Sequence, residues 1–319
     1  MPILLTPVVT PPVIPDPPRF PAPQASWTAP DGTLWPLTHP TIGWKTLRDV
    51  AGIDAPPVEL TTDAHPRGGS RVRHVQPQSR VITWPLYVRG ATATELDERW
   101  RALADAICSA DVVNGPGWLQ IERPGSGPRR IACHYQDGFD DTLQLPGKRL
   151  AVLTLYCEDP YWQAVDATTI TRRYAEPVEE YESRDYLSPY RNVVSSQVLG
   201  ATSLHNPGGI VAWPEWVITG PASEITATLV STGESWTLDP SAVTGVFGPG
   251  DELRISTDPP RVRYHPAVGA VENWVGALNW PTAVLWGLPP GSSDVEFTVS
   301  DADSDTTITL TFHPRFRTS

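Results

Sequence analysis

The sequence predicts a mainly β protein with two β-sandwich domains, the first of which carries one α-helix. Three observations support this prediction. Short apolar runs that alternate with polar residues recur along most of the 319-residue chain, and this pattern indicates strands. Turns rich in glycine and proline separate them, although 24 Gly and 36 Pro are too few for a chain that is disordered throughout. One segment alone spaces its apolar residues as a helix does.

The chain begins with a proline-rich segment, residues 1–24, which we treat as an N-terminal arm. Ten of the first thirty residues are proline, so neither a helix nor a well-paired strand is expected there. Two interpretations stay open for this arm. It is a disordered tail, or it is an extended segment that lies along a neighbouring subunit.

The first domain is expected over residues 25–165, and its first half contains two strands and a basic loop. Residues 58–62 and 81–88 read as strands. Residues 63–80 between them read as a loop that a pair of glycines makes flexible. Its four arginines, with no acid after Asp63, are Arg67, Arg71, Arg73 and Arg80. A solvated loop and a subunit-interface loop that reaches an acidic neighbour are the two interpretations.

A single helix is predicted over residues 92–110. Thr92 and Glu95 have the spacing of a capping box. Opposite charges four residues apart, Glu95–Arg99 and Asp97–Arg101, suit its exposed side. The apolar residues recur at i, i+4, i+7 and i+11 and give one buried stripe: Leu96, Trp100, Leu103 and Ile107.

Three further strands, residues 118–122, 130–135 and 150–157, complete the first domain. The last one ends at Asp159-Pro160, because proline has no N–H to give to a strand ladder. We interpret Asp159 as part of a structural turn at the domain border and not as a catalytic carboxylate.

The second domain is expected over residues 193–319, after an acidic and tyrosine-rich linker or excursion over residues 166–192. Strands at regular spacing with no helix between them indicate a β-sandwich. The predicted strands are residues 212–219, 225–230, 235–238, 252–256, 261–264, 284–288, 295–299 and 306–312.

Charge and cysteine usage exclude several classes of function. The net charge is −12, with 15 basic and 17 acidic residues up to position 165 and 9 basic and 19 acidic residues after it. An acidic chain of this kind argues against sequence-independent binding of nucleic acid. The cysteines show no paired spacing, which argues against a zinc ribbon or a disulfide framework, and we expect small buried thiols at Cys108, Cys133 and Cys157. Neither a signal peptide nor a membrane span is predicted.

No residue pattern in the chain supports a catalytic, cofactor or metal site, so we do not predict an enzyme. Asp301, Asp303 and Asp305 begin like a calcium loop, but the glycine and the final glutamate of such a loop are missing. Among thirteen tryptophans, one cluster is a candidate for stacking on sugar rings: Trp274, Trp280 and Trp286. The other interpretation of these tryptophans is a sandwich core.

The order of several motifs resembles the distal tail proteins of long-tailed bacteriophages, the siphovirus-type tail component family, and above all its actinobacterial phage members. In the first domain the motifs are VITWPLYVRG, the helix from Thr92, WLQIERPGSGPRRIACHYQDG and LTLYCEDPYW. In the second they are NPGGIVAWPEWVITGP, TGESWTL, GDELRIST, WGLPPGSSDVEFTV and ITLTFHPRFR. The resemblance covers about four fifths of the chain, and its order and spacing are more specific than any single motif.

This resemblance implies a role as well as a fold. The first domain would be tail-tube-like and ring-forming, with six copies around a channel, and the second would be a galectin-like sandwich. The homohexameric ring would join the major tail-tube protein to the baseplate hub, and the tape-measure protein and DNA would pass through it. The protein would be made in the host cytoplasm and found in the virion, without cofactor. A carbohydrate-binding tail module that holds a host-surface glycan during adsorption is the alternative, and a cell-wall glycosidase is a third.

Overall fold

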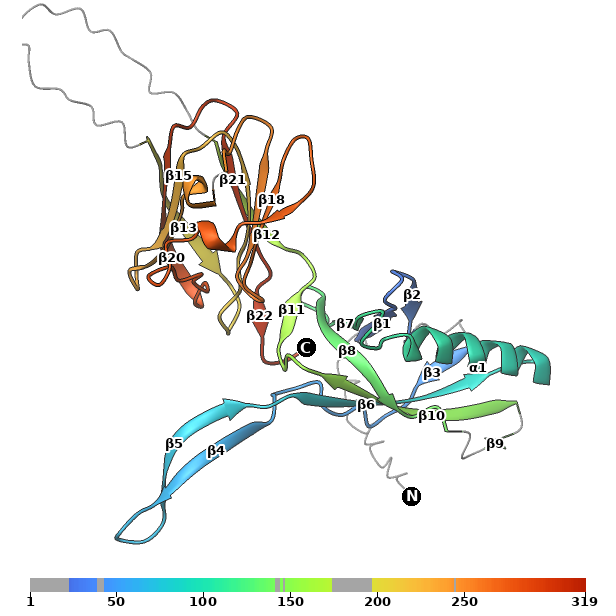
Figure 1. Ribbon diagram of the computed structural model, residues 1–319. Helices are drawn as coiled ribbons and strands as arrows, with labels where there is room; N and C mark the ends of the chain where they lie inside the picture. The colour runs from blue at the N-terminus through green and yellow to red at the C-terminus, as the bar shows by residue number, and fades with distance from the viewer. Residues whose placement is uncertain (1–22, 39–42, 141–143, 146, 174–196, 244) are drawn as a thin grey trace, which may run out of the picture.

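The computed structural model describes residues 23–319 except 39–42, 141–143, 146, 174–196 and 244. It consists of two β domains that lie one beyond the other, with a single α-helix in the first (Figure 1). Within the described residues, no helix is both long enough and apolar enough to span a bilayer. The N-terminal arm falls outside this description up to residue 22, and Gln24 already begins the first strand.

The first domain is built on one ten-stranded antiparallel sheet in the order β2-β1-β7-β8-β10-β6-β3, with β9, β11 and β22 attached at its sides. Its outer strands are short, whereas β6 and β10 pair along ten residues each. The bounds are β1 Gln24–Thr28, β2 Leu34–Pro36, β3 Trp44–Thr46, β6 Arg80–Arg89, β7 Gly117–Glu122, β8 Arg129–Asp137, β9 Gln144–Leu145, β10 Lys148–Cys157, β11 Trp162–Ala164 and β22 Arg315–Phe316. The strands predicted over residues 81–88, 118–122, 130–135 and 150–157 are confirmed.

The helix α1, Ala93–Cys108, packs on the inner face of this sheet. The Thr92 hydroxyl accepts a hydrogen bond from the Glu95 N–H at 3.1 Å, and the Glu95 carboxylate accepts one from the Ala91 N–H at 2.6 Å. The predicted capping pair is therefore present, with the carboxylate reaching one residue further back than in the standard box. The predicted apolar stripe is buried in full: Leu96, Trp100, Leu103 and Ile107.

One of the two predicted ion pairs on the helix forms, and the other is replaced. Glu95 and Arg99 lie 2.5 Å apart. Asp97 pairs with Arg149 of β10 at 2.5 Å instead of with Arg101. This second pair ties the helix to the sheet, which a pair within the helix could not do.

The second domain is a sandwich of two antiparallel sheets. One has six strands in the order β12-β21-β14-β17-β18-β19, and the other has four in the order β13-β20-β15-β16. The bounds are β12 Thr168–Arg173, β13 Gln197–Asn206, β14 Glu215–Thr219, β15 Glu224–Leu229, β16 Glu234–Leu238, β17 Glu252–Ser256, β18 Arg261–His265, β19 Glu272–Asn273, β20 Gly291–Ser300 and β21 Thr307–Phe312, with two 3-10 turns at Pro240–Val243 and Val275–Ala277.

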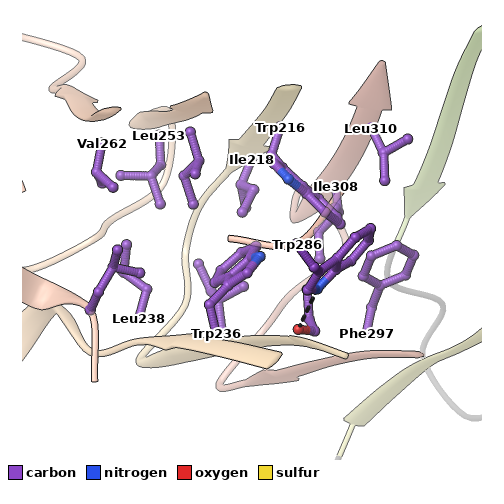
Figure 2. Close-up of a cluster of buried hydrophobic side chains, with 14 of the residues drawn as sticks. Trp216, Ile218, Trp236, Leu238, Leu253, Val262, Trp286, Phe297, Ile308 and Leu310 are labelled. Atoms are coloured by element: carbon purple, nitrogen blue, oxygen red, sulfur yellow. Dashed lines mark hydrogen bonds between the residues drawn. The ribbon is translucent and has the colours of Figure 1, made fainter. Parts of the chain in front are cut away.

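Tryptophan fills the space between these two sheets (Figure 2). Trp216 of β14 meets Trp236, Trp286 and Phe297 edge to face, with ring centroids 5.4, 5.0 and 5.5 Å from its own. The Trp286 indole N–H donates to the Ala227 carbonyl at 3.2 Å. Edge-to-face aromatic packing adds to the burial of these large side chains, so the centre of this domain is a structural core.

The second domain departs from the sequence prediction most clearly in three places. Residues 168–173, expected in the linker, form β12 and pair with β21 of the six-stranded sheet; the rest of that linker from residue 174 onward lies outside the described residues. Strand β13 was not predicted. Residues 284–288, predicted as a strand, are irregular, and Leu288 forms only an isolated bridge to Ala212. The segment is apolar because Trp286 and Leu288 are buried in the core.

The two domains are joined by two adjacent strands. The chain leaves the first domain through β11, which pairs with β8. It returns through β22, which pairs with β11 so that Trp162 faces Phe316. The second domain is thereby held at both ends of its sequence.

Candidate assembly interface

A hairpin arm, strands β4 (Val58–Ala64) and β5 (Ser70–Pro77), is the most exposed folded part of the protein. All seven residues of β4 and all eight of β5 are exposed. Figure 1 shows the arm extending away from both domains. A two-stranded hairpin is at best marginally stable by itself in water, so a long exposed hairpin of this kind is a candidate surface for contact with another molecule.

The arm has one apolar and one polar face. Val58 stands opposite Pro77, Leu60 opposite Val75 and Thr62 opposite Val72, and residues directly opposite each other in a ladder share a face. The four aliphatic side chains are 49 to 53% exposed. The other face pairs Glu59 with Gln76, Thr61 with His74 and Asp63 with Arg71. No side chain in the described residues covers the apolar face.

Residues 63–80, predicted as a flexible loop, are therefore mostly strand, and this corrects the prediction. The turn is short: the His65 N–H donates to the Gly69 carbonyl, and Gly68 and Gly69 have φ of 92° and 85°. Such angles favour glycine. Three of the four predicted interface arginines lie exposed on the arm, and Arg73 forms an ion pair with Asp63 there.

Arg80, the fourth, is not on the surface; its exposed fraction is 1%. Its Nη1 donates to the carbonyls of Gly52 and Asp54 at 2.9 and 2.6 Å, and its Nη2 donates to the Arg317 carbonyl at 2.9 Å. Burial lowers the pKa of its guanidinium, although the group stays charged. Arg80 is thus a structural link to the end of the chain and cannot contact a neighbour.

That end, residues 315–319, forms a strap along the first domain. The Ser319 N–H donates to the Ile53 carbonyl at 3.1 Å, and Arg129 donates to the Thr318 carbonyl at 2.8 Å. The Arg129 guanidinium also lies 3.7 Å from the centre of the Phe316 ring. The strap joins the two domains through side chains as well as through β22.

Asp159, predicted to belong to a structural turn at the domain border, lies at this junction. Its Oδ1 accepts from the Tyr161 N–H at 3.1 Å, and its Oδ2 pairs with Arg315 at 2.5 Å. Arg315 also donates to the Val211 carbonyl at 3.1 Å. Each carboxylate oxygen of Asp159 therefore has a partner that stabilises the domain border.

A second uncovered apolar surface lies on the outer face of β6 and β10. Val81 faces Tyr156, and Pro85 faces Val152; Val81, Tyr156 and Val152 are 46, 37 and 43% exposed. A groove beside it is lined by Leu47, Thr83, Pro85, Leu150 and Val152, among others. The arm leads into β6 after two residues, so the two apolar surfaces are neighbours in the chain. Grouped exposed apolar side chains commonly mark sites of protein contact.

The candidate sugar platform does not form. Trp274 and Trp286 are 3 and 2% exposed, so two of its three members belong to the core. Trp274 stacks on Tyr264 with ring centroids 3.8 Å apart. Trp280 alone is open, at 54%, and its indole N–H donates to the Val275 carbonyl at 2.9 Å.

Several titratable groups of the described residues take part in structural hydrogen bonds. No three His, Cys, Asp or Glu side chains gather there as metal ligands would. Asp303 accepts from the Asp305 N–H at 2.8 Å and so closes a turn. Burial and the hydrogen bond to Asp251 raise the pKa of Tyr264 to about 12. The sequence analysis did not predict the apolar face of the hairpin arm, which is formed by Val58, Leu60, Val72 and Val75.

The comparisons with known proteins give a likeness of fold. No protein-family model and no curated protein sequence matches this chain. Among solved structures, this chain is similar to the Dit protein of phage SPP1, which is described as a paradigm of the hub adsorption apparatus in phages that infect Gram-positive bacteria. The two chains are 15% identical, and the match has a TM-score of 0.60 and covers 93% of this chain and 100% of the Dit chain. Chains of the phage P2 baseplate in its activated conformation, with calcium or strontium, are 8% identical, with TM-scores of 0.57 and 0.58 over 93 and 94% of this chain and 100% of theirs.

Proposed function

We propose that this chain is a structural protein of a phage tail tip: a distal tail protein whose copies form a ring between the tail tube and the baseplate hub. The observation that carries the proposal is the fold, which is shared with the SPP1 Dit protein along 93% of this chain, both domains included. Fold likeness alone does not fix a function. The surfaces of this chain supply the additional argument.

The hairpin arm supports self-assembly. It is a folded element with an apolar face that no described side chain covers, and a neighbouring copy in a ring supplies such a cover. A ring formed by a repeated head-to-tail contact needs two different complementary surfaces on each copy. The arm is one, and the outer face of β6 and β10 is the other.

The remaining parts of the proposal follow from the ring. We infer six copies, contacts with the major tail-tube protein and the baseplate hub, and passage of the tape-measure protein and DNA through the channel. A net charge of −12 keeps phosphate from adhering to the protein, which suits a wall past which DNA must move. The protein would be located in the virion tail after synthesis in the host cytoplasm.

Native mass spectrometry of the purified full-length chain tests the proposal. We expect a closed oligomer of six copies that Leu60→Asp, on the apolar face of the arm, converts to monomer. Thr61→Asp, on the polar face next to it, is the matched control and should leave the oligomer intact. A chain that is strictly monomeric at high concentration, and also single in the assembled tail, would refute the proposal.

Carbohydrate binding stays a second candidate because Trp280 holds an open indole face in a fixed position. Glycan-array binding that Trp280→Ala abolishes would favour it. Trp286→Ala is unsuited to this test because it opens the core. If wild-type protein binds no glycan, the host-adsorption alternative is wrong.

A further inference from the structure

The two fully buried cysteines of the first domain lie side by side. Cys133 on β8 and Cys157 on β10 are both 0% exposed, and their sulfur atoms are 3.2 Å apart. Both are free thiols in the structure. They are 24 residues apart in the chain, and the sequence alone gave no reason to pair them.

The backbone allows the pair to be bridged. Tyr156 stands opposite His134 in the antiparallel ladder of β8 and β10, so the next opposed pair along the two strands is Cys157 and Cys133. Directly opposed residues have Cα atoms about 4.5 to 5.5 Å apart, within the roughly 4.4 to 6.8 Å that a disulfide spans. The sulfur atoms need to approach by only about 1 Å to reach bonding distance.

A buried positive charge stands next to this pair. Arg80 is opposite Cys157 in the ladder of β6 and β10, which places Cys133, Cys157 and Arg80 in a row across three strands. Its two terminal nitrogens are satisfied by backbone carbonyls, but its Nε is buried and has no hydrogen-bond partner. A guanidinium beside a thiol favours the thiolate, which is the reactive form.

We propose that Cys133 and Cys157 are a disulfide-forming site that a small peroxide oxidises. One sulfur, as its thiolate, attacks hydrogen peroxide; the O–O bond breaks and the leaving oxygen departs as water after taking a proton, which gives a sulfenic acid. The second thiol then attacks that sulfur, and its oxygen leaves as a second water. Two thiols and one peroxide thus give one disulfide and two waters. The peroxide accepts the two electrons.

The bridge would fix β8 to β10 beside the Arg80 link to the strap. It would therefore link two strands of the first domain covalently, next to the Arg80 side chain that binds the strap. Burial raises the pKa of Cys133 well above its ordinary value, so the reaction is expected to be slow and to depend on local opening. The inference rests on geometry within one chain and is independent of the proposed function.

Thiol counting after peroxide treatment tests the proposal on the full-length protein. The protein is incubated with hydrogen peroxide under native conditions, quenched with catalase, unfolded and alkylated. Intact mass should show that the alkylated thiols fall from three to one, with the loss of two hydrogens and no added oxygen. Peptide mapping should find one link, Cys133 to Cys157, and a reductant should restore three thiols.

Two variants make the result specific. Cys108→Ala should still form the link, whereas Cys133→Ala should form none and should keep both of its remaining thiols alkylatable. Circular dichroism checks that each variant is folded. If Cys133→Ala does not fold, Cys157→Ala takes its place. A link that contains Cys108, a link between two chains, stable sulfinic acid, or three thiols unchanged after long exposure would each overturn the proposal.

Discussion

The hairpin arm and the C-terminal strap are both short β segments that leave the body of their domain, and their surroundings are opposite. Every strand residue of the arm is exposed. The strap donates a backbone hydrogen bond to the Ile53 carbonyl, its carbonyls accept hydrogen bonds from Arg80 and Arg129, and it pairs with β11. The strap is bound by residues of its own chain, whereas the apolar face of the hairpin arm is exposed to solvent.

The difference indicates which contacts of this protein lie within one chain and which need another molecule. The strap closes an interface between domains of the same chain, so its loss should appear as lost stability of the isolated protein. We propose that the arm, by contrast, contributes little to the stability of the isolated chain and acts when a second copy is present. Unfolding measurements on the isolated chain distinguish these two roles.

The largest effect is expected from Arg80→Ala. The substitution removes three hydrogen bonds and leaves carbonyls of Gly52, Asp54 and Arg317 without their buried donor. We expect a loss of roughly 3 to 5 kcal/mol, because groups abandoned in the interior incur their full desolvation cost. Urea unfolding of dilute protein measures it. Arg73→Ala on the arm is the control and should change stability by less than about 0.5 kcal/mol; equal losses in the two variants would contradict the division.

Arg315→Ala should have an intermediate effect, about 1 to 2 kcal/mol. The side chain loses its hydrogen bond to the Val211 carbonyl and its pairing with Asp159. Asp159 is half exposed, so solvent weakens the ionic part. A double-mutant cycle with Asp159→Ala should give a coupling of about 0.5 to 1 kcal/mol. Strict additivity would show that the pair contributes nothing at the junction.

A smaller, pH-dependent effect is expected from His313, which lies between β21 and the strap. Its Nδ1 is 3.0 Å from the Ala164 carbonyl, and burial, with help from Arg130, lowers its pKa below the ordinary 6.5. The folded state therefore favours the neutral ring, while the unfolded chain binds the proton more readily. The stability from this group is complete above about pH 6.5 and is lost as the pH falls from there through the lowered folded pKa.

The midpoint of thermal unfolding between about pH 7.5 and 5 checks this dependence. Wild type should lose more stability on acidification than His313→Gln does, whereas His74→Gln on the arm should behave as wild type. Identical pH profiles for wild type and His313→Gln would remove His313 from the explanation.

The smallest effect on the isolated chain is expected from Leu60→Asp. The side chain is already 53% exposed, and surface substitutions away from special contacts usually change stability by less than about 0.5 kcal/mol. Unfolding of dilute, monomeric protein should therefore match that of wild type and of Thr61→Asp. A loss above about 1 kcal/mol would mean that the apolar face of the arm packs against its own chain, and would weaken its assignment as an assembly surface.

Local signals in the sequence were sufficient for the helix and most strands. The capping pair Thr92 and Glu95 and the stripe that includes Trp100 are read within one segment, and the structure confirms them. The strand β12, in contrast, has the sequence TTITRR and depends on a partner strand about 140 residues further on, where Thr169 meets Thr311. No local sequence pattern predicts the pairing of β12 with β21.

The site was harder to predict than the fold because its residues follow no simple period. Val72 and Val75 are three apart, which breaks strand alternation; the bulge at this point of the ladder returns both to the apolar face. Arg80 has the same basic side chain as its neighbours in the sequence, but it is buried by contacts with distant carbonyls, one of them 237 residues away. Long-range contacts also decide that Trp286 is core and Trp280 is surface.

The pairing of β11 with β22 has a consequence for how such proteins diversify. The outgoing and returning strands of the second sandwich are antiparallel neighbours, with Trp162 beside Phe316. The sandwich is thus an insertion with two adjacent attachment points, comparable to a long loop grafted onto a sheet edge. Another domain whose ends lie equally close could be exchanged at these points without altering the order of the remaining strands of the first sheet. A pull on the sandwich would be shared by two strands, so the joint is mechanically stronger than a single linker.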